Sequence, residues 1–136
     1  MGIETVGAGI KIRLQTISDL RVFAPNELPG SVNQFPAALI LPVVTEYQTT
    51  FSTTDGDYNF RIILLLTNQD NPKALDRMLP YMESTGTKSI TTAINADSTL
   101  GGTAACCRVD RNLGFGSTMW GGSLYLSTEF EMRVWA

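Results

Sequence analysis

The chain has 136 residues, of which 43% are hydrophobic and 17% charged, a length sufficient for one domain, residues 1–136, with its own core. The net charge of −3, from 10 basic and 13 acidic side chains without any run of lysine or arginine, argues against a nucleic-acid-binding surface, which needs clustered positive charge. The sequence also lacks histidine, the commonest general base and a frequent zinc ligand, which favours a structural protein over an enzyme.

The first predicted element is a helix over residues 3–17. Gly7 and Gly9 weaken it by roughly 1 kcal/mol each relative to alanine. Its apolar side chains recur at steps of three and four and form one stripe: Ile3, Val6, Ile10, Leu14 and Ile17. Residues 19–23 predict a short strand, and residues 24–36, which include three prolines, predict a long loop.

A hairpin is predicted next. Residues 37–44 predict a strand, with Pro42 at an edge or an end. Residues 47–53 alternate as a second strand, and Asp55-Gly56 is a strong signal for a short hairpin turn. Residues 57–67 predict the return strand, which becomes continuously apolar and therefore buried on both faces.

Two helices are predicted in the middle of the chain. The first spans residues 72–84 and is kinked or shortened by Pro80. Its predicted inner stripe is Leu75, Met78, Leu79 and Met82. The second spans residues 88–96 with Thr87 as its cap. Its predicted inward side chains are Ile90, Ala93 and Ile94, and a turn follows at residues 99–102.

The C-terminal region predicts two strands separated by a loop. The strands are residues 103–110 and 122–136, and the loop, residues 112–122, contains four glycines. In the last strand one predicted buried face carries Leu124, Leu126, Thr128, Phe130, Met132 and Val134. The predicted solvated face carries Tyr125, Ser127, Glu129, Glu131, Arg133 and Trp135. The element order predicts an α+β fold with a mostly antiparallel sheet, long hairpins and helices packed on one face.

The glycine-rich loop contains the clearest candidate interaction residues. Large apolar side chains on such a loop reduce solubility unless they meet a partner, and aromatic residues are enriched at interfaces. We therefore expect a protein interface formed by Phe115, Met119, Trp120 and Asn112. The alternative is a loop that folds back over the sheet edge.

Several carboxylate and thiol groups are candidate sites. The pairs Asp55/Asp57 and Glu129/Glu131 are able to perform acid–base chemistry if a cleft holds them, but turn formation and solvation explain them better. The adjacent Cys106 and Cys107 predict two reduced thiols, without a disulfide or a zinc site. We therefore expect no catalytic, metal-binding or cofactor-binding residues.

The sequence predicts neither a signal peptide nor a membrane-spanning segment. Residues 1–10 lack the features of a signal peptide, and the longest apolar run, residues 62–66, is far shorter than the ~20 residues that span a bilayer. These features lead us to expect a soluble protein made in the cytoplasm.

Several short segments, taken together and in order, resemble the tail terminators and related head-to-tail joining proteins of long-tailed bacteriophages. The segments lie between residues 20 and 136. They are Phe35-Pro36-Ala37-Ala38, the hairpin region 47–68, Leu79-Pro80-Tyr81-Met82 with Gly86, Ser89-Ile90, Ala93-Ile94, residues 97–102, Gly121-Gly122, Tyr125-Leu126 and Glu129-Phe130.

The resemblance implies a structural virion protein of the tail and neck that is assembled in the host cytoplasm. Such proteins form a homo-oligomeric ring, usually a hexameric ring, on the head-proximal end of the tail tube. The implied partners are the tail tube protein and the neck or stopper protein, while genomic DNA passes through the lumen without specific binding. On this view the interface residues of the glycine-rich loop contact a neighbouring subunit or the tail tube. The hairpin with Asp55, Gly56 and Asp57 then faces the lumen or the tube.

Two other functions remain open from the sequence. One is a different neck component, a stopper or adaptor head–tail connector, which has a similar size and a similar kind of sequence. The other is a small ligand-binding domain or enzyme, for which a cleft with paired carboxylates and a monomeric state would be expected.

Overall fold

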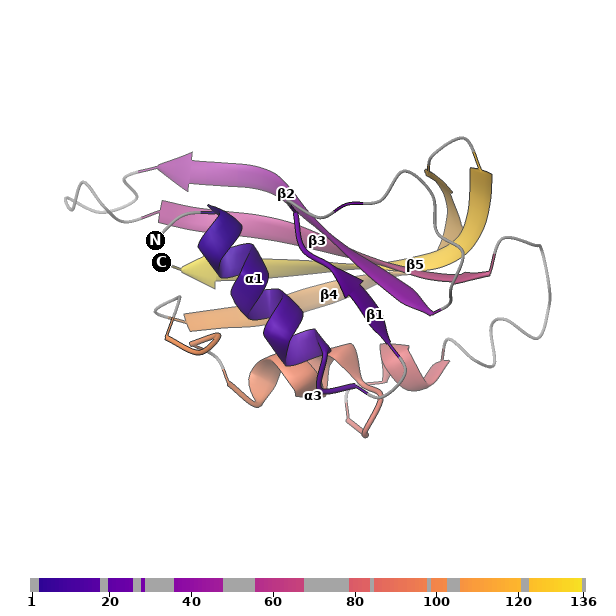
Figure 1. The fold of residues 1–136 in the computed structure, drawn as a ribbon, viewed down its shortest axis with the longest axis horizontal. Helices are drawn as coiled ribbons and strands as arrows, with labels where there is room; N and C mark the ends of the chain where they lie inside the picture. Colours follow the sequence, from indigo (N-terminus) through magenta and orange to yellow (C-terminus); the bar gives the residue numbers. More distant parts are fainter. Residues whose placement is uncertain are drawn as a thin grey trace.

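The described residues form a central five-stranded sheet, and their helices lie on one of its faces (Figure 1). The computed structural model describes residues 3–17, 20–25, 28, 36–47, 56–67, 79–83, 85–97, 99–102, 106–120 and 123–135. Its α+β architecture with a mostly antiparallel sheet confirms the predicted fold class.

The strands are arranged in the order β1-β2-β3-β5-β4. Their bounds are β1 Arg21–Phe23, β2 Ala37–Tyr47, β3 Gly56–Thr67, β4 Cys106–Trp120 and β5 Ser123–Trp135. The short β1 pairs in parallel with β2, and all the other described neighbours are antiparallel. The sheet is therefore mixed, and the short strand predicted at residues 19–23 is confirmed over Arg21–Phe23, while residue 19 lies outside the described residues.

Helix α1, Ile3–Leu14, confirms the first predicted helix, although it ends three residues before the predicted boundary. Its predicted stripe is buried at Val6, Ile10 and Leu14. Gly7 has a packing function that the sequence did not indicate, because a Cβ atom at this position would lie 2.6 Å from Cδ of Pro25. The residue that weakens the helix thus allows the chain before β2 to approach it closely.

The other described helices are short. Helix α3, Ile90–Asn95, buries Ile90, Ala93 and Ile94 as predicted, but its N-cap is Ser89, whose Oγ accepts a hydrogen bond from Thr92 N (3.1 Å). The prediction of Thr87 as the cap was wrong. Ser89 Oγ also donates to the Glu83 carbonyl (2.6 Å), so one hydroxyl joins α3 to the preceding helical turn.

Residues 79–82 form that helical turn and include Pro80. Leu79 is 44% exposed, whereas Tyr81 is 4% exposed and packs in the core. The predicted inner position of Leu79 was therefore wrong, while Met82 packs partly against the core. The remaining part of the predicted helix, residues 72–78, lies outside the described residues.

The first hairpin differs from the prediction. β2 runs without a break through Pro42 to Tyr47, and a register shift between Pro42 and Thr45 accommodates the proline. Because β1 pairs only with residues 37–39, the missing N–H of Pro42 removes no bond to β1. Gly56 lies in the ladder opposite Tyr47 and so belongs to β3 rather than to the predicted turn. Asp55 and residues 48–53 of the predicted second strand lie outside the described residues.

The second hairpin is longer than predicted. The predicted loop at residues 112–122 is the second half of β4, which remains paired with β5 as far as the pair Trp120–Ser123. The pairing has two register shifts, one between Val109 and Arg111 and one between Asn112 and Phe115, and the second contains Gly114. Bulges of this kind permit a glycine inside a long strand that still pairs at both ends.

Two apolar clusters lie on opposite faces of the sheet. The larger one packs under α1 and α3 and contains Phe60, Ile62, Phe130 and Met132, so we name this side the helix-covered face. The smaller one lies on the opposite side, the outer face, where Phe23, Leu28 and Trp120 pack against a small buried group. That group is Ala37, Leu39, Ile63, Leu65 and Tyr125.

The two clusters explain where the alternation predicted for β5 fails. From Thr128 to Val134 the predicted inner positions are buried. Nearer the hairpin end, Tyr125 is buried on the outer face, whereas Leu124 is 55% exposed. The second cluster covers the outer face only at this end of the sheet, so the periodicity alone placed both residues wrongly.

None of the described helices is long and apolar enough to cross a membrane.

Candidate interaction surfaces

The part of the outer face that the second apolar cluster leaves uncovered carries charged side chains from three adjacent strands. We name it the outer arginine face. Its members are Arg61 on β3, Arg108, Asp110 and Arg111 on β4, and Glu129, Glu131, Arg133 and Trp135 on β5. The cross-strand pairs Arg61–Glu131 and Arg111–Glu131 bring residues far apart in the sequence into one row.

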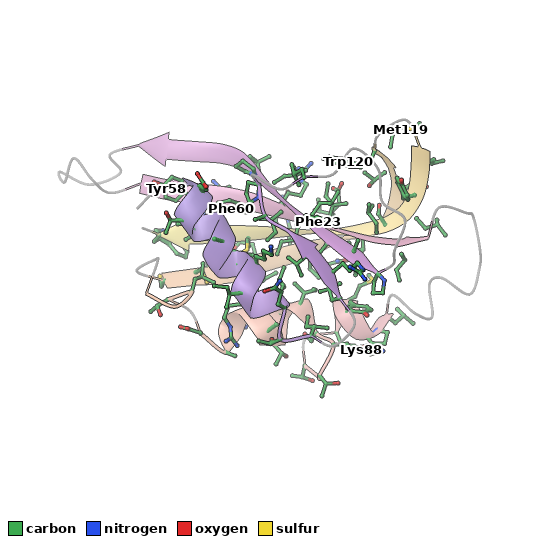
Figure 2. The ribbon with its side chains drawn as sticks, in the orientation of Figure 1. Phe23, Tyr58, Phe60, Lys88, Met119 and Trp120 are labelled. Carbon is green, nitrogen blue, oxygen red and sulfur yellow. The ribbon has the colours of Figure 1, made fainter. Side chains whose placement is uncertain are left out.

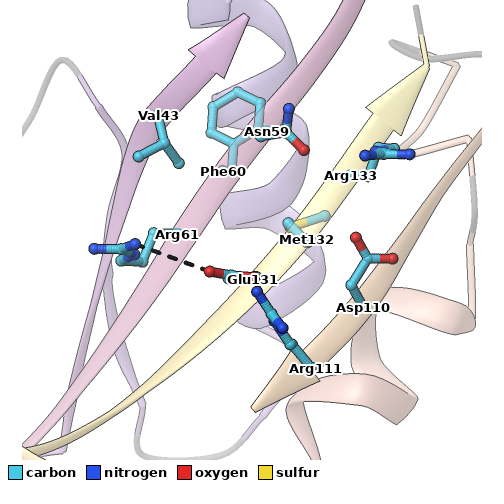
Figure 3. Close-up of a pocket in the computed structure, with 9 residues that line it drawn as sticks. All are labelled: Val43, Asn59, Phe60, Arg61, Asp110, Arg111, Glu131, Met132 and Arg133. Carbon is cyan, nitrogen blue, oxygen red and sulfur yellow. Dashed lines mark hydrogen bonds and ion pairs between the residues drawn. The ribbon is translucent and has the colours of Figure 1, made fainter. Parts of the chain in front are cut away.

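Ion pairs connect this surface across the strands. Nε of Arg111 donates to Oε2 of Glu131 at 2.7 Å, and this hydrogen bond raises the pKa of Arg111 above its ordinary value. The Arg61 guanidinium lies 3.9 Å from Glu131 and 3.8 Å from Glu129. Glu131 therefore sits between two guanidinium groups contributed by β3 and β4, as Figure 3 shows.

A second group on the same face is built around Trp135. The guanidinium carbons of Arg108 and Arg133 lie 5.5 and 5.8 Å from the centre of its ring, which is the distance of a cation–π contact. Arg108 also pairs with Asp110 at 2.7 Å. These contacts hold a large aromatic side chain on a sheet face that no described helix covers.

The outer arginine face contains a shallow depression of about 540 Å³. Its floor is formed by the strands, and Arg61, Arg111, Glu131 and Arg133 are among its lining side chains (Figure 3). The Nε atoms of Arg61 and Arg133 are buried and have no hydrogen-bond acceptor among the described residues. The depression therefore contains ion-paired side chains together with two Nε–H donors that have no acceptor among the described residues.

The end of the β4–β5 hairpin forms a second candidate surface. Met119 is 64% exposed and its ladder partner Leu124 is 55% exposed, so two apolar side chains lie side by side in solvent. Figure 2 shows Met119 at the end of the hairpin. Exposed apolar side chains that lie next to each other are typical of protein interfaces.

The predicted interface residues have different positions. Met119 is exposed as expected, whereas Trp120 packs partly against the second apolar cluster, which corresponds to the alternative that the segment covers the sheet. The backbone of Phe115 belongs to β4 opposite Thr128, and its side chain lies outside the described residues. The structure thus brings Met119 together with Leu124, a residue that the sequence had placed in the core.

Asn112 has a structural position that the prediction missed. Its Nδ2 donates to Thr128 Oγ1 (2.7 Å) and to the Glu129 carbonyl (3.2 Å), and its Oδ1 accepts from Gly114 N (2.8 Å). Thr128 Oγ1 in turn donates to the Gly114 carbonyl (2.9 Å). Asn112 therefore fixes the second register shift of β4, and its side-chain groups already have partners within the chain.

The predicted acidic hairpin is described only at its base. Gly56 and Asp57 are the first two residues of β3, with Asp57 opposite Glu46 on one side and Trp135 on the other. The side chain of Asp57 and the whole of Asp55 lie outside the described residues. Their predicted position toward a lumen or tube stays a prediction.

The adjacent cysteines point in different directions. Cys106 is exposed and free, and Cys107 is buried and free, which agrees with two reduced thiols on opposite strand faces. Burial raises the pKa of Cys107 to about 11. Among the described residues, no group of three or more His, Cys, Asp or Glu side chains is placed to hold a metal ion.

Sequence reasoning missed the outer arginine face because its members come from three strands. The alternation in β5 did place Glu129, Glu131, Arg133 and Trp135 on one face, and the structure confirms that they share it. The contribution of Arg61 depends on the pairing of β3 with β5, which no local pattern indicates.

No protein-family model matches the chain, and no curated protein sequence matches it significantly.

Proposed function

We propose that the protein is a structural component of a long-tailed phage that assembles as a ring of identical copies on the head-proximal end of the tail tube. In this function it stops tube growth and provides the junction with the neck. The ordered sequence resemblance to tail terminators supplies the class, and the exposed surfaces of the fold support an assembly role.

The observation that carries the proposal is the apolar pair at the end of the β4–β5 hairpin. Met119 and Leu124 face each other in the ladder, and more than half of each side chain is exposed. On the helical side of the molecule, Ile12 of α1 has a similar exposure of 63%, but it is a single residue. An exposed pair on a rigid hairpin is suited to insertion into a complementary pocket of a tube or of a neighbouring copy.

The test replaces this pair by charges. In Met119→Glu/Leu124→Glu we expect a folded protein that no longer caps tubes, because two carboxylates would be desolvated at the contact. The measurement is tail length by electron microscopy in the phage that encodes the chain, with circular dichroism as the test of folding. We expect tails of uncontrolled length.

Ile12→Glu is the matched control, since it places a carboxylate at an equally exposed apolar site. It should give tails of normal length. Normal tail length in the folded Met119→Glu/Leu124→Glu variant would contradict the proposed capping surface. Tails that form normally without the protein at all would contradict the function.

A stopper or adaptor function predicts a different location. A terminator should be present on tails that carry no head, whereas a head-bound connector should be absent from them. Image reconstruction of headless tails therefore separates the two functions.

A further inference from the structure

A second pocket, of about 430 Å³, lies between the helical turn that begins at Leu79 and the segment of residues 85–88. We name it the Leu79 pocket. Leu79 and Pro80 give it an apolar wall, and Leu79 is 44% exposed there. Among the described residues that line it, only Glu83 and Lys88 are charged, and their charges are opposite. Its volume lies within the ~300–1,000 Å³ of pockets that accommodate a ligand.

Hydrogen bonds fix both walls of the Leu79 pocket. In the helical turn, the backbone N of Glu83 donates to the Leu79 carbonyl (3.1 Å). On the other side, the backbone N of Ser89 donates to the Gly86 carbonyl (3.3 Å). Ser89 Oγ joins the two sides, because it donates to the Glu83 carbonyl (2.6 Å). The pocket is therefore formed before any partner arrives, which lowers the entropic cost of binding.

The end of the β4–β5 hairpin has properties that complement this pocket. Residues 112–128 contain no charged residue, and Met119 and Leu124 lie exposed beside each other in the ladder. Trp120, the neighbour of Met119, packs partly against the second apolar cluster and so holds the hairpin end on the sheet. Burial of the apolar pair is favourable and removes no charge of the hairpin end from water.

The depression on the outer arginine face is a less suitable acceptor for the apolar pair. Five of the described side chains that line it are charged, against two of opposite sign in the Leu79 pocket. Apolar groups that cover charged side chains displace their water without replacing its hydrogen bonds, which is unfavourable.

The hairpin end cannot reach the Leu79 pocket of its own copy. Figure 2 shows Met119 and the pocket residue Lys88 on opposite sides of the molecule. Two residues that are far apart in one projection are also far apart in space. A contact between the apolar pair and this pocket therefore has to join two copies.

We propose that the hairpin end of one copy, with Met119 and Leu124, inserts into the Leu79 pocket of a second copy. The two surfaces are different, so the contact is heterologous and forms a ring when the rotation between copies closes. The inference rests on the ring-forming function proposed above, and it names a neighbouring copy, not the tail tube, as the partner of the apolar pair.

The contact is tested by cross-linking two proteins that each carry one reactive thiol. One is Ser117→Cys/Cys106→Ser, with the thiol on the same strand face as Met119, and the other is Thr87→Cys/Cys106→Ser, with the thiol at the pocket. Cys107 is buried in both and does not compete. In the mixture we expect a short bismaleimide to join position 117 of one copy to position 87 of another, as identified by mass spectrometry of the linked peptides.

A charge in the pocket shows whether the link depends on the proposed groups. Leu79→Glu in the Thr87→Cys protein should lower the yield of the link at least about tenfold, as a substitution at the centre of an interface does. Val43→Glu in the same protein is the matched control, because Val43 is similarly exposed (47%) and lines the depression on the outer arginine face. It should leave the yield unchanged, and circular dichroism checks that each variant is folded.

The proposal is overturned if the 117–87 link is absent, or if Leu79→Glu leaves its yield unchanged. A yield lowered by Val43→Glu and not by Leu79→Glu also overturns it and places the hairpin end in the depression.

Failure of this contact is distinguishable from failure of the tail function. If the link is absent but Met119→Glu/Leu124→Glu still gives tails of uncontrolled length, the function stands and the subunit contact is wrong. If the link forms and depends on Leu79 while tails form normally without the protein, the contact stands and the tail function is wrong.

Discussion

Individual polar residues in this protein mostly stabilise turns and bulges. Asp97 shows this most clearly, because its Oδ1 accepts from Thr99 Oγ1 (2.7 Å) and Thr99 N (3.1 Å) and its Oδ2 accepts from Gly101 N (3.0 Å). These bonds hold the turn in which Leu100 adopts a positive φ of 52° and buries its side chain. The hydrogen bond from the Thr99 hydroxyl, followed by the backbone bonds, lowers the pKa of Asp97 below its ordinary value of 3.8.

The lowered pKa of Asp97 predicts a pH dependence of stability. A carboxyl group whose pKa is lower in the folded state contributes stability above its unfolded pKa, and that contribution is lost as the pH falls through its folded pKa. We expect the difference in unfolding midpoint between wild type and Asp97→Asn to be largest near neutral pH and to shrink below about pH 4. Urea unfolding at several pH values measures it.

Glu83→Gln serves as the control for this experiment, because it removes an exposed carboxylate elsewhere in the same half of the chain. A difference between wild type and Asp97→Asn that stays constant from neutral pH to pH 2 would contradict the assigned hydrogen bonds.

At the scale of elements, close packing and register matter more than local propensity. Helix α1 contains Gly7 although alanine is the better helix former, because Pro25 occupies the space that a Cβ atom would need. Strand β4 contains Gly114 and Gly116 and still pairs with β5 over its second half. In both elements, contacts with another segment of the chain explain why a glycine that disfavours the local secondary structure is tolerated.

Helix propensity and packing therefore predict opposite effects of Gly7→Ala on the free energy of unfolding. Propensity predicts a gain of roughly 1 kcal/mol, whereas distances of 2.6 and 2.8 Å to the Pro25 ring predict a clash. We expect a net loss of about 1–3 kcal/mol in the free energy of unfolding, as for other overpacked sites. Urea denaturation measures it.

Gly116→Ala is the comparison for Gly7→Ala, since no atom lies within 4 Å of its added Cβ. We expect its free energy of unfolding to stay close to that of the wild type. A Gly7→Ala protein more stable than wild type would show that α1 and Pro25 are not in contact.

At the scale of the whole molecule, the helices lie on one face of the sheet and leave the other face available. The helix-covered face holds the larger core, and the outer face is divided between the second apolar cluster and the outer arginine face. Figures 1 and 2 show α1 lying across the strands that carry Tyr58 and Phe60. Among the described residues, the helices therefore pack on one face of the sheet only.

Two substitutions in β5 test this layer arrangement. Phe130 is 1% exposed under the helices, and Leu124 is 55% exposed at the hairpin end. Phe130→Ala should lower the free energy of unfolding by about 3–5 kcal/mol, because it creates a cavity. Leu124→Ala should lower it by less than about 1 kcal/mol. Similar losses in both variants, measured by chemical denaturation, would contradict the placement of Leu124 in solvent.

The local sequence determined the elements whose periodicity is strong. The stripe from Val6 to Leu14 predicted α1, the alternation and the apolar run predicted β3, and the alternation from Thr128 to Val134 predicted the inner face of β5. These patterns suffice because each follows the layers that pack against its segment, with one covered face for α1 and this part of β5 and two covered faces for the apolar run of β3. The absence of histidine and of any run of lysine or arginine is also visible in the sequence alone, and the non-enzymatic function that it leads us to expect stays a prediction.

Only the tertiary structure decided which faces are covered at the two ends of the sheet. Periodicity describes side chains relative to their own strand, and burial depends on what packs against that strand. For this reason Tyr125 is buried, Leu124 is exposed and Trp120 packs inward. Arg61, Arg111 and Arg133 form one surface because pairing between strands joins them, and no segment of the sequence contains that information.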